Sequence, residues 1–226
     1  MSDFFYQASA VRYVVVILGL SLSACSRTSE QSEKQLLERA KTFQKEGKTE
    51  SQIIELKNLL QKNPNHPEGR WLLGEAYSIQ GYGREAEKEL LRAQELGIDP
   101  EVTKVALGKS ILDQGDFKRV LNEIRPGSNS SARNIAAIKT LYGQAELGLK
   151  KYETGCALFR EAQDIDATYI PAYWESAKCS LGFGKPLEAE EEVAKAIKVD
   201  DQNYVVVRLA EWVPSKQKAL TEVKSD

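Results

Sequence analysis

The sequence contains little histidine, methionine or cysteine, and no excess of charge of either sign. Its 226 residues include one His (His66), one Met and three Cys. A single histidine excludes a His-rich metal site, and any catalytic triad would have to use His66. Lys and Arg number 31 against 33 Asp and Glu, so the formal net charge is −2. Because there is no basic excess to displace counterions, we expect no nucleic-acid partner.

Long hydrophobic runs are also missing. The longest apolar run covers residues 14–24, whereas a membrane-spanning helix needs about 20 residues. The run follows a weakly positive start, which is typical of a secretory signal, here residues 1–24. It ends in Leu22-Ser23-Ala24-Cys25, which resembles the lipobox of bacterial lipoproteins. The alternative is an ordinary signal with a coincidental cysteine.

The lipobox resemblance implies that Cys25 becomes the first mature residue and carries lipid. Two or more acyl chains would anchor it stably. In lipoproteins of bacteria with two membranes, a residue such as Ser26 after the cysteine implies transfer to the outer membrane, facing the periplasm. Residues 25–32 are small and polar, so we expect a short tether.

Small residues recur along the remaining sequence with a period of about 34. One series runs Ala40, Gly74, Gly108, Gly143, Ala177, and a second runs Gly47, Gly81, Gly115, Gly184. Glycines of the second series suit the left-handed residue that ends a helix. Members of the first suit points where two helices cross closely. Each period therefore predicts a pair of helices.

The clearest unit covers Pro67–Pro100. It has L-G-x-x-Y at Leu73, Gly74 and Tyr77, and then Gly81, Ala86 and Ala93. These positions resemble the tetratricopeptide repeat (TPR), and the resemblance implies an all-α solenoid of antiparallel helix pairs. We place its units at 33–66, 67–100, 101–135, 136–169 and 170–203, with a half-repeat at 204–213.

Two prolines mark expected irregularities. The segment Pro126–Ser131 should shorten the second helix of the third unit to about residues 117–124. Pro214 should end the last helix. Residues 214–226 are then a polar tail or a weak capping helix. Without a cap, the helix over residues 204–212 leaves an open edge suited to homodimerisation or docking.

Two stretches, Gln61–Tyr77 and Ala86–Pro100, carry a narrower resemblance. Together with the lipobox they resemble the N-terminal part of PrsT-type TPR lipoproteins of exosortase (PEP-CTERM) systems, which serve exopolysaccharide and surface-protein export. That family is several times longer, so the chain would be a short relative or a truncated form. Secretin pilotins and the TPR lipoprotein of the barrel assembly machine stay open as alternatives, although no motif here is specific to either.

We find no catalytic set of residues. Ser215-Lys-Gln-Lys218 has Ser-x-x-Lys spacing but lies in a polar tail, and Glu190–Glu192 is typical of a solvated helix face. We therefore expect no enzyme activity, no cofactor and no metal. Cys156 and Cys179 occupy positions of adjacent helices that could face each other. They would form either a disulfide in an oxidising compartment or a pair of small buried hydrophobic residues.

Positions 2, 5, 9, 12 and 13 of each unit should line the concave face of the solenoid. That set includes Trp71, Glu75, Val105, Lys109, Leu112, Thr140, Gln144, Trp174, Lys178, Leu181, Arg208 and Trp212. A register error of one residue would instead place Trp71 and Trp174 in the core. The face is aromatic and mildly basic, which favours protein or peptide partners, with polysaccharide as the alternative. The expected function is a membrane-anchored scaffold or adaptor in envelope export, or a carbohydrate-binding module of the same machinery.

Overall fold

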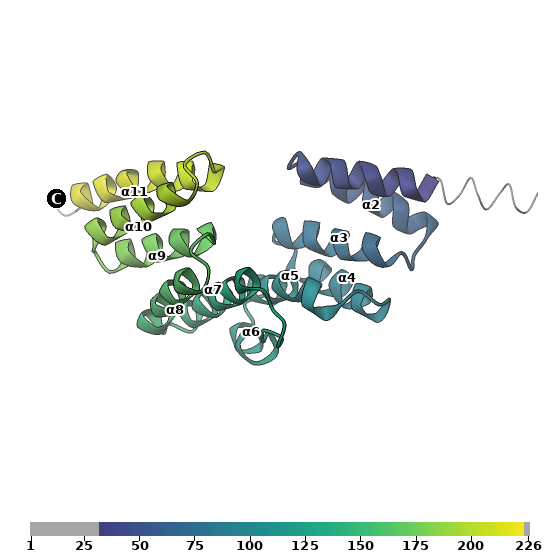
Figure 1. Cartoon of the computed structure of the whole chain (residues 1–226), viewed down its shortest axis with the longest axis horizontal. Helices are drawn as coiled ribbons and strands as arrows, with labels where there is room; N and C mark the ends of the chain where they lie inside the picture. Colours follow the sequence, from purple (N-terminus) through teal and green to yellow (C-terminus); the bar gives the residue numbers. More distant parts are fainter. Residues whose placement is uncertain (1–31, 224–226) are drawn as a thin grey trace, which may run out of the picture.

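The computed structural model describes residues 32–223, with side chains as far as Lys216. The expected signal, the lipidated Cys25 and nearly all of the tether lie outside the described residues. Over residues 32–223 the chain consists of helices and turns, with no strand. Successive helix pairs stack side by side and follow an arc, with the N-terminal helices at one end and α9–α11 at the other (Figure 1).

Five helix pairs and one further helix make up the arc. The helices cover residues 32–45, then α2 Thr49–Lys62, α3 Pro67–Ile79, α4 Gly83–Glu95, α5 Pro100–Asp113, α6 Phe117–Glu123, α7 Ala132–Gly148, α8 Tyr152–Ile165, α9 Ile170–Gly182, α10 Pro186–Val199 and α11 Tyr204–Val223. Helix 32–45 pairs with α2, α3 with α4, α5 with α6, α7 with α8, and α9 with α10. None of the described helices is both long and apolar enough to cross a membrane.

A left-handed residue joins the two helices of every pair. Gly47, Gly81, Gly115 and Gly184 have φ angles of 68°, 76°, 78° and 71°. These positive φ angles confirm that the recurring glycines are the left-handed residues that end the first helix of each pair, a conformation that glycine adopts without steric cost. In the fourth pair Lys150 takes the same role with φ 64°.

The other series of small residues lies where the two helices of a pair cross. Ala40 and Ala177 are fully buried. Gly74 packs directly against Leu90, and Gly143 packs against Phe159 and the backbone of Gly155. A larger side chain at these positions would force the pair apart, which explains the period.

The third pair is the irregular one. Helix α6 has 7 residues and ends before Pro126, close to expectation. The fourth unit is expected to start at residue 136, but α7 begins at Ala132. The cause is Ser131, whose Oγ accepts a hydrogen bond from Asn134 N at 3.2 Å and caps the helix one turn early.

The expected end of the last helix at Pro214 is wrong. Helix α11 continues through this proline to Val223, so residues 214–223 extend the helix instead of forming a separate cap. A proline removes the hydrogen bond to the carbonyl four residues earlier, and its ring crowds that carbonyl. Val206, Leu209 and Val213 are fully buried against the last pair, and this packing offsets the lost bond.

Candidate functional site

The first helices of successive pairs lie next to one another and build the inner face of the arc. Side chains from helix 32–45, α3, α5 and α7, together with the turn before α9, surround an open hollow of about 470 Å³. Its lining residues are Gln44, Glu75, Ser78, Ile79, Val102, Val105, Ala106, Lys109, Arg133, Asn134, Ala137 and Tyr169. We call this hollow the central groove.

The middle of the central groove is apolar and open to solvent. Ile79 is 63% exposed and Val102 is 48% exposed, although both are large aliphatic residues. Val105 is partly buried against the core between α5 and α7, so it links the groove surface to the interior. Exposed aliphatic side chains in a concave surface are typical of a binding site for another apolar group.

Glu75 is the acidic residue of the central groove. Burial raises the pKa of its carboxyl above the ordinary value, and the neighbouring side chains of Trp71 and Gln44 oppose that rise. The indole Nε1 of Trp71 is itself buried and lacks a hydrogen bond of good geometry within the described residues. The carboxyl therefore lies in a poorly hydrated part of the groove beside an indole N–H that has no other acceptor.

Two basic residues of the central groove differ in their surroundings. Lys109 Nζ donates hydrogen bonds to Asp113 Oδ2 at 2.7 Å and to the carbonyl of Ser78 at 2.9 Å. Its charge is therefore already compensated. The guanidinium of Arg133 lies over the ring of Tyr169, 5.6 Å from the centroid, and it makes no ion pair with any described carboxylate.

A second hollow of about 320 Å³ lies between α9 and α11. It is lined by Pro171, Trp174, Glu175, Tyr204, Val205 and Arg208. One face of Trp174 is covered, because its ring stacks on Trp212 with centroids 5.5 Å apart. Lys178 and Gln144 bind the carboxylate of Glu175 at 2.8 Å and 3.1 Å. We call this hollow the terminal groove.

The structure divides the residues expected on the concave face. Glu75, Val105 and Lys109 line the central groove, and Trp174 and Arg208 line the terminal one. The others do not line either groove. Trp71 and Leu112 pack on core clusters, and Thr140 and Leu181 are buried. Gln144 donates a hydrogen bond to Glu175, Lys178 lines the hollow beside Cys156 and Cys179, and Trp212 stacks on Trp174. Trp71 and Trp212 are partly buried against core clusters and therefore offer less open surface than Trp174. The role of these residues in partner binding stays a prediction.

Several lining residues were missed by sequence reasoning. Seven of them occupy the selected repeat positions and could have been named from the period: Gln44, Ser78, Ile79, Val102, Ala137, Pro171 and Val205. Arg133 and Asn134 could not, since they precede the expected start of their unit. Their place in the groove depends on the early start of α7.

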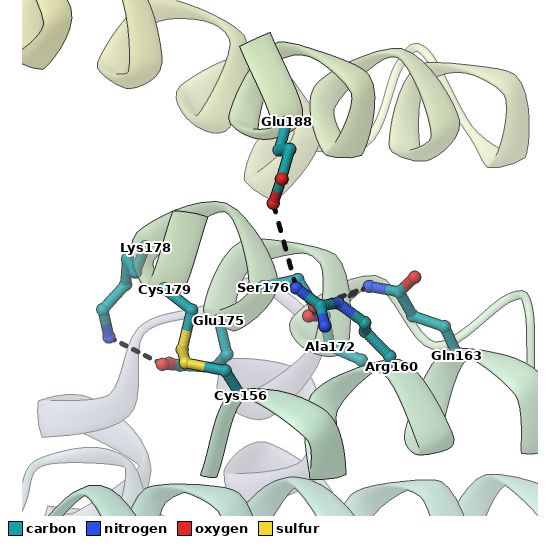
Figure 2. The surroundings of a disulfide bond; sticks show 9 residues. All are labelled: Cys156, Arg160, Gln163, Ala172, Glu175, Ser176, Lys178, Cys179 and Glu188. Carbon is teal, nitrogen blue, oxygen red and sulfur yellow. Dashed lines mark hydrogen bonds and ion pairs between the residues drawn. A yellow bond between two sulfur atoms is a disulfide. The ribbon is translucent and has the colours of Figure 1, made fainter. Parts of the chain in front are cut away.

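Cys156 of α8 and Cys179 of α9 form a disulfide, with Cα atoms 5.8 Å apart (Figure 2). The bond ties the fourth pair to the fifth. Beside it lies a hollow of about 370 Å³ whose lining includes the exposed rings of Tyr152 and Phe183. Deeper in the same interface Gln163 Nε2 donates to Ser176 Oγ at 2.9 Å and Glu192 Oε2 at 2.7 Å. These polar contacts fix the relative position of the two pairs.

The other groups considered for chemistry have structural surroundings. His66 Nδ1 accepts a hydrogen bond from Gly69 N at 3.1 Å, so this histidine caps α3. Ser215 Oγ donates to the carbonyl of Trp212 at 2.7 Å. Among the described residues, no group of three or more His, Cys, Asp or Glu side chains is arranged to hold a metal ion.

Comparison with known proteins identifies the fold. No protein-family model and no curated protein sequence matches the chain. Among solved structures, the thermophilic TPR protein TTC0263 of Thermus thermophilus superimposes with a TM-score of 0.62 at 16% identity, covering 79% of this chain and 97% of that one. A TPR protein of Parabacteroides merdae gives 0.60 at 16%, covering 79% and 69%. PilF of Pseudomonas aeruginosa gives 0.55 at 13%, covering 84% and 89%.

These similarities, together with the helix pairs described above, show that the chain has the TPR helix-pair solenoid fold. At such low identity they bear on the fold and not on the binding partner. The similarity to PrsT-type lipoproteins stays a prediction from sequence.

Proposed function

We propose that this protein is an interaction scaffold that binds a peptide segment of a partner protein along the inner face of the solenoid. The observation that supports this is the central groove, where Ile79 and Val102 expose aliphatic surface between isolated charged groups. A peptide can cover such surface with one apolar side chain and satisfy the charges with its neighbours. A rigid array of stacked helices also needs little reorganisation on binding.

A polysaccharide fits the same face less well. Sugar rings stack on open aromatic faces, but Trp174 has one face covered by Trp212 and Trp71 packs against the N-terminal core. Titration with exopolysaccharide while tryptophan fluorescence is recorded separates the two ligand classes. Saturable quenching that peptide cannot compete away would contradict the peptide proposal.

Groove binding is tested with a matched pair of variants. Ile79 and Ile54 are both exposed isoleucines, at 63% and 58%, but Ile79 lines the central groove and Ile54 lies on α2. Peptides are selected from a displayed random library on the purified chain, and their affinities are measured by fluorescence anisotropy. We expect Ile79→Glu to weaken binding at least tenfold, because a charge replaces the apolar contact.

Ile54→Glu should leave the affinities unchanged. Equal losses in both variants, or no loss in Ile79→Glu, would show that peptides do not use the central groove. Circular dichroism of the two variants checks that each retains the helical fold, and both substitutions replace exposed side chains, so both should fold.

We propose that lipid on Cys25 holds the scaffold at the bacterial envelope, where it serves an export system of the exosortase or exopolysaccharide kind. The support is the lipobox and the two sequence stretches described above. Cys25→Ala should move the protein from the membrane fraction to the aqueous fraction of lysed cells. If the variant stayed in the membrane fraction, the lipid anchor would be refuted while groove binding could still hold.

Self-association through the C-terminal edge is a separate proposal. Tyr204, Val205 and Val207 of α11 are exposed at 73%, 39% and 42%, which gives this edge apolar surface that a second copy could cover. Light scattering at increasing concentration should show a dimer. A constant monomer mass at high concentration would rule it out.

A further inference from the structure

Glu75 differs from the other shielded carboxylates of this protein. Glu89, Glu175 and Glu192 are each less than 9% exposed, and each makes an ion pair, with Arg70, Lys178 and Lys195 respectively. Glu75 is partly buried, yet it makes no ion pair with any residue between 32 and 216, and only the neutral side chains of Trp71 and Gln44 oppose the effect of burial on its carboxyl. Lys109, the lysine that lines the central groove, is engaged by Asp113 and the Ser78 carbonyl.

An unpaired carboxylate in a poorly hydrated groove is costly unless a ligand neutralises it. The burial that raises the pKa of Glu75 shows the same cost. A cationic side chain of a bound peptide would remove it, because the ion pair would form away from bulk water. The central groove therefore favours a peptide that places a basic side chain beside Glu75.

The opposite charge lies further along the same groove. Arg133 lines the central groove at the start of α7, where it makes no ion pair with a described carboxylate. Asp166, whose pKa is lowered mainly by hydrogen bonds from Thr168, lies near enough to feel its charge as well. Val102 and Val105 belong to α5, the helix that lies between α3 and α7, and Ile79 follows Glu75 by one turn on α3. The groove therefore presents an acidic end, an apolar middle and a basic end, in the order of the helices.

We infer that the central groove selects a peptide segment with a Lys or Arg for Glu75, an apolar residue over Ile79 and Val102, and an Asp or Glu for Arg133. This inference rests on the proposed function and names the partner's chemistry. Helices α3 and α7 are two neighbours apart, roughly 16–20 Å at the usual interaxial distances. An extended chain advances about 3.3 Å per residue, so the two charged residues should lie about five or six positions apart.

The test is a parallel selection from one random peptide library on three proteins: the wild type, Glu75→Lys and Glu85→Lys. Glu85 is an exposed carboxylate in the first turn of α4, on the second helix of the same pair, and serves as the matched control. The wild type and Glu85→Lys should enrich a basic residue at one fixed distance from an acidic one. Glu75→Lys should lose the basic residue and enrich an acidic one in its place.

A second measurement avoids any effect of lysine on folding. For a peptide from the wild-type pool, Glu75→Gln and replacement of the peptide's basic residue by Gln should each weaken binding about tenfold. The two replacements together should weaken binding little more than either one alone, since both remove the same contact. Additive losses would overturn the inference.

The outcomes separate the inference from the proposed function. In one outcome, Ile79→Glu weakens peptide binding, but wild type and Glu75→Lys select peptides with the same charge pattern. This result would support groove binding and refute the role of Glu75. A library that yields no peptide sensitive to Ile79→Glu would refute the proposed function itself. In that case a saturable response to exopolysaccharide would point to the carbohydrate alternative.

Discussion

The crossing of α7 and α8 tests whether the recurring small residues are needed for close packing of the paired helices. Gly143 of α7 faces Gly155 of α8, and Phe159, which is fully buried, lies against it. A methyl carbon added to Gly143 would lie 2.8 Å from Phe159 Cδ1, even closer to Cε1, and 2.9 Å from the carbonyl oxygen of Gly155. The substitution Gly143→Ala is therefore expected to destabilise the protein.

The size of the effect follows from two opposing terms. Overpacking a rigid site costs roughly 1–3 kcal/mol, and the upper end applies here because a buried ring and a backbone carbonyl must both move. Alanine in place of glycine within a helix gains about 1 kcal/mol in propensity. The net loss should be about 2 kcal/mol, which for a domain of this size lowers Tm by roughly 4–8 °C.

Gly182 provides the control. It is the last residue of α9, it has no atom within 4 Å of the position of an added methyl carbon, and its φ angle is not positive. Gly182→Ala should therefore leave Tm unchanged or raise it slightly. Both variants are followed by circular dichroism during heating and during urea titration, with identical buffers and protein concentrations.

A Gly143→Ala protein as stable as the wild type would refute the reasoning, because it would mean that α7 and α8 can separate without cost. Equal destabilisation of both variants would refute it as well. That result would show a general sensitivity to losing glycine rather than a requirement for close helix approach.

Three further predictions concern other contacts. The double variant Cys156→Ser, Cys179→Ser should lose about 3 kcal/mol, since the disulfide closes a loop across 23 positions of sequence; a reductant should lower the Tm of the wild type but not of the variant. Arg70→Ala should lose about 2 kcal/mol in urea unfolding, because it leaves the buried carboxylate of Glu89 without its ion pair, and an unchanged midpoint would contradict this. Hydrogen bonds from Lys104 and from the loop after α6 lower the pKa of Glu101. The ionised carboxyl of Glu101 therefore stabilises the folded protein above pH 4.5, and this contribution is lost as the pH falls through the lowered folded-state pKa. NMR of the loop amides should therefore show it loosening at acid pH in the wild type, and already loose at neutral pH in Glu101→Gln.

Local sequence signals predicted the helix pairs well because each signal acts within a few residues. A glycine at a left-handed turn is required by the turn itself, and Gly47, Gly81 and Gly115 confirm this. The same approach did not foresee that Lys150 takes that conformation, since a lysine gives no such signal. It also misjudged Pro214, because the packing that keeps α11 intact comes from residues of α9 and α10.

The concave face shows the limit of periodic reasoning. Repeat positions place a side chain on a helix, but the curvature of the stack decides whether that position faces the groove or a neighbouring helix. The repeat assigns both Trp174 and Trp212 to the concave face. In the structure their rings stack on each other, because α9 and α11 lie side by side. Arg133 enters the groove because Ser131 starts α7 one turn early.

The sequence by itself determined the all-α class, the period of 34 residues, the short α6 and the residues that cross between paired helices, since all of these follow from spacing along one chain. Only the tertiary structure decided which predicted groove residues are open, that Cys156 and Cys179 are bonded, and that Glu75 lies beside Trp71 with no ion-pair partner among residues 32–216. Those properties depend on distances between helices and on the exclusion of water, and neither can be obtained from the order of residues alone.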